Sequence, residues 1–218
     1  MKKVYAISIL FLIGAVTTAY SLPILQLDAE PGEYIGGTEE STVATSNQFT
    51  LSALLDNNQL TNYADYQFYV SVALTPQTGE FSGGDFGSFD FNGSTVNVTN
   101  DMQWGTPPVD AAFEKSNDLP SHGIYDTWYA QFDLDFSAAD LVDAYNVQTD
   151  EPKAGDQLLS LSYLVDLSNL GSGFGLHFDL YGYMMDGGEA IVKSLINCLL
   201  YTSPSPRDRT RSRMPSSA

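Results

Sequence analysis

The sequence predicts an all-β protein with a single domain, an antiparallel β-sandwich of the jelly-roll type. Apolar and polar side chains alternate in most segments, which is the period of a half-buried strand. Clusters of Gly, Pro, Asn and Asp separate these segments and are typical of turns. No repeat of fixed period is present, which argues against a solenoid or a propeller. We expect about eight strands with little helix.

Two long alternating segments occupy the N-terminal half. In residues 49–55 the apolar face comprises Phe49, Leu51, Ala53 and Leu55. In residues 66–72 the apolar face comprises Tyr66, Phe68, Val70 and Val72, with Tyr69 on the opposite face. Farther along, Asn92-Gly93 separates two short alternating runs, which predicts a hairpin with a two-residue turn.

Three further segments alternate in the C-terminal half. Their apolar faces comprise Trp128, Ala130, Phe132, Leu134 and Phe136, then Leu159, Leu161, Tyr163 and Val165, and finally Phe174, Leu176, Phe178 and Leu180. The middle segment has an opposite, wet face of Ser160, Ser162, Leu164 and Asp166. Two other segments, "SAADLVDAY" (137–145) and "EAIVKSLIN" (189–197), favour local helix.

Residues 1–21 have the layout of a secretory signal peptide. Two lysines precede an apolar stretch, and small residues follow it, so cleavage is expected after Ala19 or Ser21. The apolar stretch is shorter than the roughly 20 residues that span a bilayer. A buried N-terminal helix is the alternative. The sequence therefore predicts export of a domain that covers residues 22–197.

Residues 198–218, "CLLYTSPSPRDRTRSRMPSSA", differ sharply from the rest of the chain. They contain all four arginines and the only cysteine. The run resembles the translation of a sequencing adapter of the transposase-fragmentation type, interrupted by a sample barcode. We expect it to be a disordered, adapter-derived artefact, with a natural basic tail as the alternative. The natural C-terminus is then expected to be missing, with truncation near Asn197.

The expected domain is strongly acidic. Residues 22–197 contain 26 Asp and Glu against three lysines, a formal charge of −23. This balance argues against nucleic acid as a partner and disfavours anionic membrane surfaces. A membrane would be reached only through the missing C-terminal anchor. Without cysteine, the domain has no disulfides, although export would permit them.

The sequence offers few residues for catalysis. His122 could pair with Asp118 or Asp126, but a turn histidine bonded to the backbone is the favoured interpretation. His177 shares a face with Asp179 by the two-residue period, which predicts a position on the sheet surface. Two histidines on separate segments without cysteine give little support for zinc. We assign no catalytic, metal-binding or ligand-binding residue from the sequence, and the expected protein is not an enzyme.

Three weaker hypotheses remain open. The acidic loops 56–65 and 150–156 offer oxygen ligands for calcium, but neither has the order of a known calcium loop, and solvated loops are favoured. Pairs of carboxylates leave glycoside hydrolysis open. Aromatic side chains on wet faces could stack on sugar rings, as in carbohydrate-binding modules; the candidates are Tyr63, Tyr66, Tyr69, Trp104, Tyr125, Trp128 and Tyr129.

Several blocks between residues 25 and 182 resemble the choice-of-anchor N family of exported bacterial proteins. The most specific block is "LPSHGIYDTWYAQF" (119–132), and "FYVSVALTPQTG" and "GDFGSFDFNGSTVNVTNDMQWGTPP" also match. The resemblance implies a cell-surface or extracellular-matrix protein of a Gram-negative bacterium, followed by a sorting signal that is often of the PEP-CTERM kind. It implies no catalytic residues. We expect a structural or adhesive role, with exopolysaccharide or other envelope components as partners; a carbohydrate-binding module is the alternative.

Overall fold

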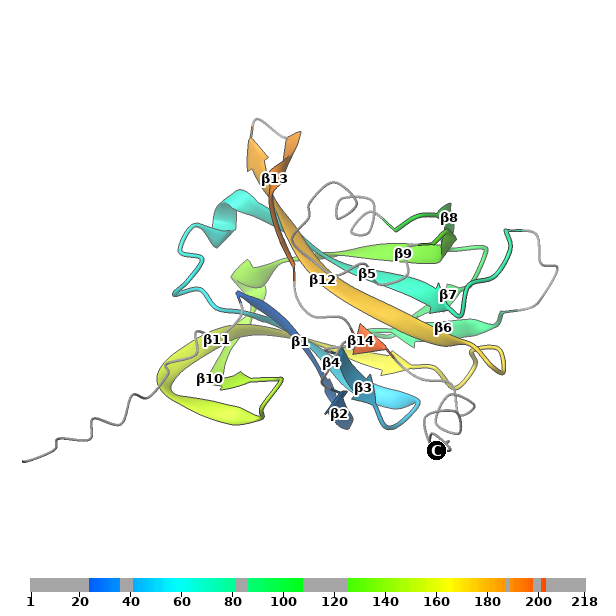
Figure 1. Ribbon diagram of the computed structural model, residues 1–218, viewed down its shortest axis with the longest axis horizontal. Helices are drawn as coiled ribbons and strands as arrows, with labels where there is room; N and C mark the ends of the chain where they lie inside the picture. Colours follow the sequence, from blue (N-terminus) through cyan, green and yellow to red (C-terminus); the bar gives the residue numbers. More distant parts are fainter. Residues whose placement is uncertain are drawn as a thin grey trace, which may run out of the picture.

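Two β-sheets pack face to face around a large apolar core (Figure 1). A second, smaller apolar cluster comprises Leu54, Ala144 and Leu158. The structure is a computed structural model, and it describes residues 24–35, 41–80, 86–107, 125–186, 189–197 and 201–202. All strand pairings are antiparallel except the short contact between β14 and β3. The predicted all-β sandwich with one domain is therefore confirmed.

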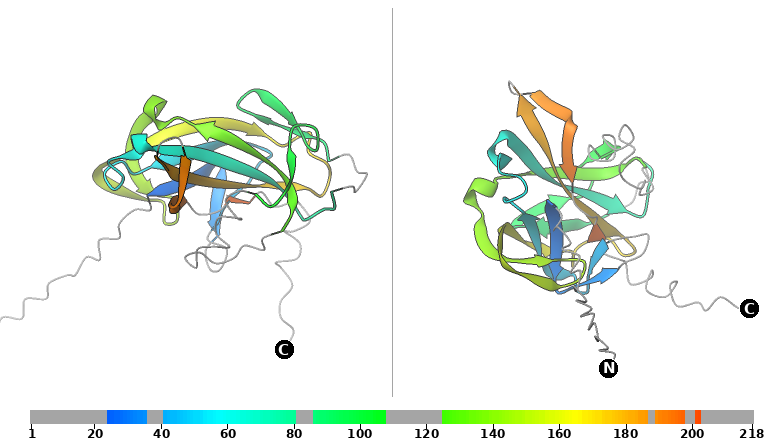
Figure 2. Two further views of the ribbon diagram at one scale, coloured as in Figure 1. Left: turned by 90° about the horizontal axis from the view of Figure 1, so that it is seen from above. Right: turned by 60° about the vertical axis from the view of Figure 1, so that its left-hand side comes forward.

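One sheet has six strands, and it carries the candidate site. Its path runs through β1 (Leu25–Glu30), β4 (Gln48–Leu55), β11 (Glu151–Asp166), β6 (Ser88–Phe91) and β7 (Ser94–Asn97). The sixth strand, β10 (Asp140–Asn146), pairs with the first half of β11. The β10–β11 hairpin curls around one end of the sandwich (Figure 2).

The other sheet has eight strands. Its path runs through β2 (Gly32–Ile35), β3 (Ser41–Ala44), β14 (Tyr201–Thr202), β12 (Gly175–Asp186), β5 (Tyr66–Thr75), β9 (Thr127–Leu134) and β8 (Gln103–Gly105), and β13 (Glu189–Asn197) pairs with β12. Two 3₁₀ turns, η1 (Tyr63–Asp65) and η2 (Phe136–Ala138), complete the described elements. The strands therefore outnumber the expected eight, because several are too short to show a clear alternation.

The core consists of the side chains that the two-residue period places inward. Every apolar face predicted from the alternating segments contributes to one core cluster. Most of these side chains are buried, and those that are only partly buried are Tyr66, Trp128, Ala130, Phe132, Leu161, Tyr163 and Phe174. Ring contacts join the two sheets. Phe49 meets Phe178 edge-on at 6.1 Å between ring centroids, and Phe91 stacks on Phe132 at 4.3 Å. Burial of such side chains stabilises the fold by roughly 1.5–3 kcal/mol each.

Both predictions of local helix are wrong. In residues 137–145 only the short turn η2 is helical, and the rest forms strand β10. Residues 189–197 form strand β13. In each segment a neighbouring strand offers backbone partners, β11 for β10 and β12 for β13, and each ladder contains one shift of register. Pairing in the tertiary structure outweighs a weak local helix preference.

The predicted hairpin at Asn92-Gly93 is confirmed. Strands β6 and β7 pair with Phe91 opposite Ser94, so the turn has two residues. Asn92 and Gly93 have φ angles of 49° and 79°, the left-handed conformation that a tight hairpin turn of this type requires. The Asn92 N–H also donates to the Leu164 carbonyl at 2.7 Å, which fixes the hairpin beside β11.

The ends of the chain are described only in part. The predicted signal peptide, residues 1–21, lies outside the described residues. Within the tail 198–218, the backbone of Tyr201–Thr202 pairs with His177 and Phe178 of β12 and with Thr42 of β3. No helix in the described part of the chain is long and apolar enough to cross a bilayer. The origin of the tail stays a prediction.

Candidate functional site

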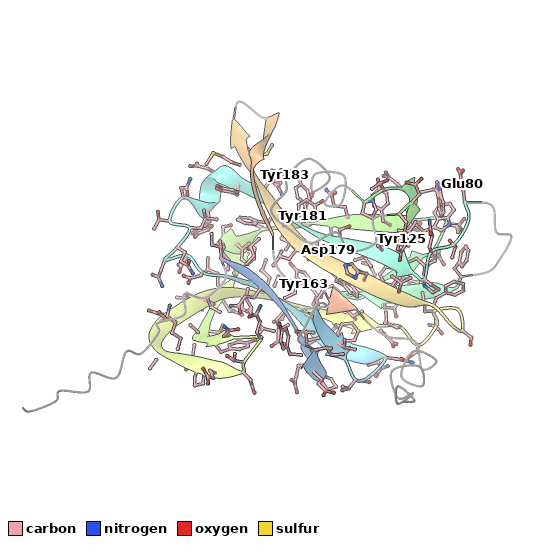
Figure 3. The ribbon with its side chains drawn as sticks, viewed as in Figure 1. Glu80, Tyr125, Tyr163, Asp179, Tyr181 and Tyr183 are labelled. Carbon is pink, nitrogen blue, oxygen red and sulfur yellow. The ribbon has the colours of Figure 1, made fainter. Side chains whose placement is uncertain are left out.

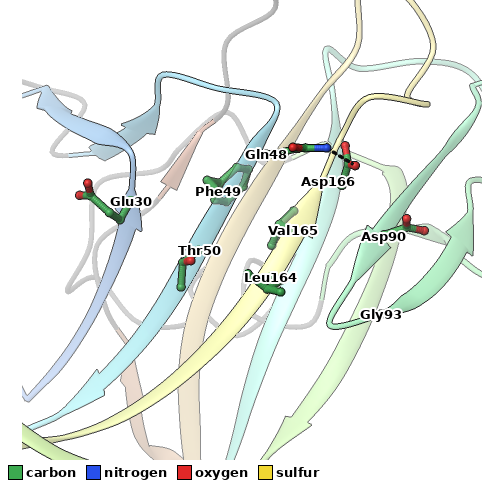
Figure 4. A pocket seen from close by; sticks show the side chains of 9 residues that line it. All are labelled: Glu30, Gln48, Phe49, Thr50, Asp90, Gly93, Leu164, Val165 and Asp166. Carbon is green, nitrogen blue, oxygen red and sulfur yellow. Dashed lines mark hydrogen bonds between the residues drawn. The ribbon is translucent and has the colours of Figure 1, made fainter.

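An open hollow of about 480 Å³ lies on the outer face of the six-stranded sheet (Figure 4). Two rows of side chains from neighbouring strands line it. The register places Glu30, Thr50 and Leu164 in one row and Gln48, Asp166 and Asp90 in the other. Residues directly opposite in antiparallel strands point to the same face, with Cβ atoms about 5 Å apart. The pairing of β1, β4, β11 and β6 therefore assembles the hollow.

Hydrogen bonds hold the carboxylates of the second row. Asp166 accepts from the Ser168 backbone N–H and from Gln48 Nε2, both at 2.8 Å. The bonds from Ser168, and then the bond from Gln48, lower the pKa of Asp166 below its ordinary value. Asp90 accepts from Thr95 Oγ1 at 2.6 Å. The lining residues include no lysine, arginine or histidine, so the hollow carries negative charge at neutral pH.

Leu164 is the apolar member of the hollow. It is 68% exposed, more than any other large apolar side chain that the structure describes. The two-residue period of β11 turns it outward, as the sequence predicted, while its neighbours Tyr163 and Val165 pack in the core cluster. The bond from Asn92 to the Leu164 carbonyl brings the β6–β7 turn beside it. An exposed apolar group thus lies among carboxylates and an amide.

A second, smaller hollow adjoins the first at Glu30, which lines both. Its volume is about 290 Å³, and Asp28, Tyr145 and Asp150 also line it. Tyr145 donates its hydroxyl to Asp28 at 2.6 Å. Burial, followed by the hydrogen bond to Asp28, raises the pKa of Tyr145 far above its ordinary value. We call these two adjoining hollows the acidic track; their carboxylates are Asp28, Glu30, Asp90, Asp150 and Asp166.

The outer face of the eight-stranded sheet has a different, tyrosine-rich character. Asp179, Tyr181 and Tyr183 follow one another on this face of β12 (Figure 3). Tyr181 donates to Gln131 at 2.6 Å, and its ring stacks on Tyr69 at 5.4 Å. Burial, and then the neighbouring tyrosines and Asp179, raise the pKa of Tyr181. These phenols stay protonated at physiological pH and act as hydrogen-bond donors.

Each predicted histidine candidate has a clear outcome. His122 and Asp118 lie outside the described residues, and Asp126 accepts from Thr106 Oγ1 at 2.7 Å. His177 shares its face with Asp179, as predicted, with 3.2 Å between Nε2 and the carboxylate. It lies on the face of β12 opposite the core residues Leu176 and Phe178, as predicted, and its side chain is 16% exposed. The neighbouring Ser71 hydroxyl is buried and has no hydrogen-bond partner among the described residues.

In each of the two acidic loops considered for calcium, one carboxylate is bonded within the protein. Asp56 accepts from the backbone N–H groups of Asn58 and Gln59 and from the Gln59 side chain. Lys153 pairs with Asp156 at 2.8 Å. Across the described ranges, no three His, Cys, Asp or Glu side chains converge as metal ligands. The geometry of these loops is accounted for by turn formation and ion pairing.

The two tryptophans do not form the expected wet platform. Trp104 and Trp128 are cross-strand partners with 5.6 Å between ring centroids, and Trp128 packs against the core cluster. Its indole N–H is buried without a hydrogen-bond partner in the described part of the chain. Tyr69 and Tyr129 do lie on the outer face, since they belong to the set opposite the core. Trp104 and Trp128 therefore share the core-facing side of the eight-stranded sheet.

The sequence predicted the outward direction of Leu164 and Asp166 but not the hollow itself. Apart from Val165, the other lining residues come from β1, β4, β6 and the β6–β7 turn, which are far away in the chain. Only the strand order brings them together, and no local pattern encodes that order. Comparison of the chain with protein-family models, with curated proteins and with solved structures found no match.

Proposed function

We propose that the chain is an exported protein of the cell surface or extracellular matrix of a Gram-negative bacterium, with a structural or adhesive role and no catalytic activity. The observation that carries the proposal is the open hollow on the six-stranded sheet, where polar side chains and one leucine lie exposed on a paired layer of strands. Side chains on strands hold their positions better than side chains on loops, which suits repeated adhesive contact. The leader-like N-terminus and the resemblance of residues 25–182 to choice-of-anchor proteins support export.

The acidic composition supports the same role. A formal charge of −18 for the whole chain keeps a secreted protein soluble and favours cationic partners over nucleic acid or anionic lipid. We propose that envelope components, including exopolysaccharide, are the partners, and that a C-terminal sorting signal holds the natural protein at the surface.

Export is tested by expressing the full chain in a Gram-negative host. We expect the mature protein to begin after Ala19 or Ser21, as measured by mass spectrometry of its N-terminus. A matched variant with Lys2 and Lys3 replaced by glutamate should stay in the cytoplasm unprocessed. An unprocessed wild-type chain that accumulates in the cytoplasm would contradict the proposal.

A carbohydrate-binding module is the second candidate function. The exposed Leu164 among hydrogen-bonding side chains favours it, because sugar rings present both hydroxyls and an apolar face. A glycoside-active enzyme is a weaker third candidate. Binding without release of reducing sugar ends separates the module from the enzyme, and prolonged incubation of the protein with its bound glycan measures this directly.

A further inference from the structure

The negative charge of the acidic track limits which ligands can bind there. Glu30, Asp90 and Asp166 reach the larger hollow from three different strands, and no positively charged side chain lines it. Asp28 and Asp150 extend the negative charge into the adjoining hollow. The acidic chain as a whole adds a field of the same sign. A ligand with negative charge, such as a polymer of uronic acids, would be repelled, whereas a cationic ligand is attracted.

The lining indicates an organic cation rather than a metal ion. In the described ranges, no three His, Cys, Asp or Glu side chains converge on one point, whereas calcium sites commonly gather several carboxylates with other oxygen ligands. The hollow instead combines spaced carboxylates with the amide of Gln48, the hydroxyl of Thr50 and the exposed side chain of Leu164. This mixture matches a ligand that has hydroxyl groups, a positive charge and an apolar face.

The position of the hollow favours a glycan over a peptide. Its floor is formed by β4 and β11, and each of these strands is paired on both sides. Their backbone groups are used in the sheet ladder, so a peptide cannot be recognised there by strand addition. A ligand therefore meets the side chains of the hollow and the backbone of Gly93 in the β6–β7 turn. Sugar hydroxyls and amines can bond to such side chains one by one and do not need the free strand edge on which strand addition by a peptide depends.

We propose that the acidic track on the outer face of the six-stranded sheet binds a cationic amino glycan, a polysaccharide whose hexosamine units carry free amines. The amines lie against Glu30, Asp90 and Asp166, and the apolar face of one ring lies on Leu164. The adjoining hollow takes a further unit of the same chain. This inference rests on the proposed adhesive function and names the chemical class of its partner.

The test measures binding of a glucosamine hexamer to the full chain by calorimetry at low salt. The fully N-acetylated hexamer is the matched ligand without charge, a glucuronic acid hexamer has the opposite charge, and a lysine hexamer is a cation without sugar. We expect binding of the glucosamine hexamer only. The dissociation constant should rise about tenfold for Asp166→Asn, which corresponds to the loss of one charged contact.

Matched variants distinguish binding in the hollow from general electrostatic attraction to the acidic protein. Leu164→Ser should weaken binding, whereas Leu141→Ser should not, because Leu141 is the other strongly exposed leucine of the same sheet and lies outside the hollow. Asp143→Asn is the corresponding control for Asp166→Asn, since Asp143 is an exposed residue of β10 outside the hollow. All four changes are at solvent-facing positions, and unchanged melting temperatures verify that each variant is folded.

Several outcomes would overturn the inference. These are equal binding of the N-acetylated hexamer, preferred binding of the glucuronic acid hexamer, equal binding of the lysine hexamer, or unchanged affinity in both Leu164→Ser and Asp166→Asn. A negative result in these binding experiments does not affect the proposal of export, because processing of the leader is measured independently. Conversely, an unprocessed cytoplasmic chain that still binds glucosamine would contradict the proposed location while retaining the binding site.

Discussion

At the scale of single residues, Gly182 and the phenyl ring of Phe68 pack closely against each other in the core. Gly182 is on β12 directly opposite Phe68 on β5, and a Cβ at this glycine would lie 2.7 Å from Cδ1 of the phenyl ring. Phe68 cannot move away easily, because its ring packs against Phe136 at 4.9 Å between centroids. The core therefore requires glycine at this position of the strand.

We expect Gly182→Ala to lower the free energy of unfolding by about 1–3 kcal/mol, the usual cost of overpacking a core. Urea denaturation followed by tryptophan fluorescence measures this change. Gly79→Ala is the matched control and should be nearly neutral, since a Cβ there meets nothing within 4 Å. Equal stability of both variants would contradict the packing argument.

A second prediction concerns the phenol of Tyr145. Its hydroxyl donates to the partly buried Asp28 at 2.6 Å, so Tyr145→Phe leaves this carboxylate without that donor. We expect a loss of about 1–3 kcal/mol in the free energy of unfolding. Tyr129→Phe removes only an exposed contact of 3.4 Å to Gln103 and should cost far less. A thermal or urea melt of the two variants compares them directly.

At the scale of elements, the sequence predicted the long strands well and the short ones poorly. Strands β4, β5, β9, β11 and β12 alternate over many residues, so their inward faces could be assigned in advance. Strand β10 was missed because its segment has a local helix pattern, and only pairing with β11 makes it extended. The hollow was not predicted, since it depends on which strands are neighbours.

The turn η2 allows a prediction on pH dependence. Asp135 accepts from the backbone N–H of Ser137, and hydrogen bonds to Ser137 lower the pKa of Asp135 below its ordinary value. A lowered pKa in the folded state stabilises the fold above the unfolded value, near 4, and this contribution disappears as pH falls through the folded value. The side chain of Asp135→Asn cannot titrate. The amount by which its free energy of unfolding lies below that of the wild type should therefore shrink below about pH 4.

Urea midpoints at a series of pH values and constant ionic strength measure this difference. The same comparison with Asp143→Asn, at an exposed position of β10, reports the general effect of removing one negative charge. If the difference in urea midpoint between Asp135→Asn and the wild type instead grows as the pH falls, the expected direction of the pH dependence is wrong.

At the scale of the whole molecule, net charge opposes folding. A formal charge of −18 creates repulsion that is screened as salt shortens the Debye length, from about 30 Å at 10 mM to about 10 Å at 0.1 M. We expect the melting temperature to rise over this range of sodium chloride. Calcium and magnesium chloride at equal ionic strength should give equal rises. A specific excess for calcium that chelation reverses would instead indicate a calcium site.

The alternation along the last six residues of β11, 161–166, has a consequence for how this protein evolves. Leu161, Tyr163 and Val165 pack in the interior, while Ser162, Leu164 and Asp166 face the exterior. Adjacent residues of this strand therefore serve packing and surface recognition in turn. Mutation can alter the exterior set without disturbing the interior one. We therefore expect diverging lineages to exchange the exterior residues first, and a new recognition specificity can arise on an unchanged scaffold.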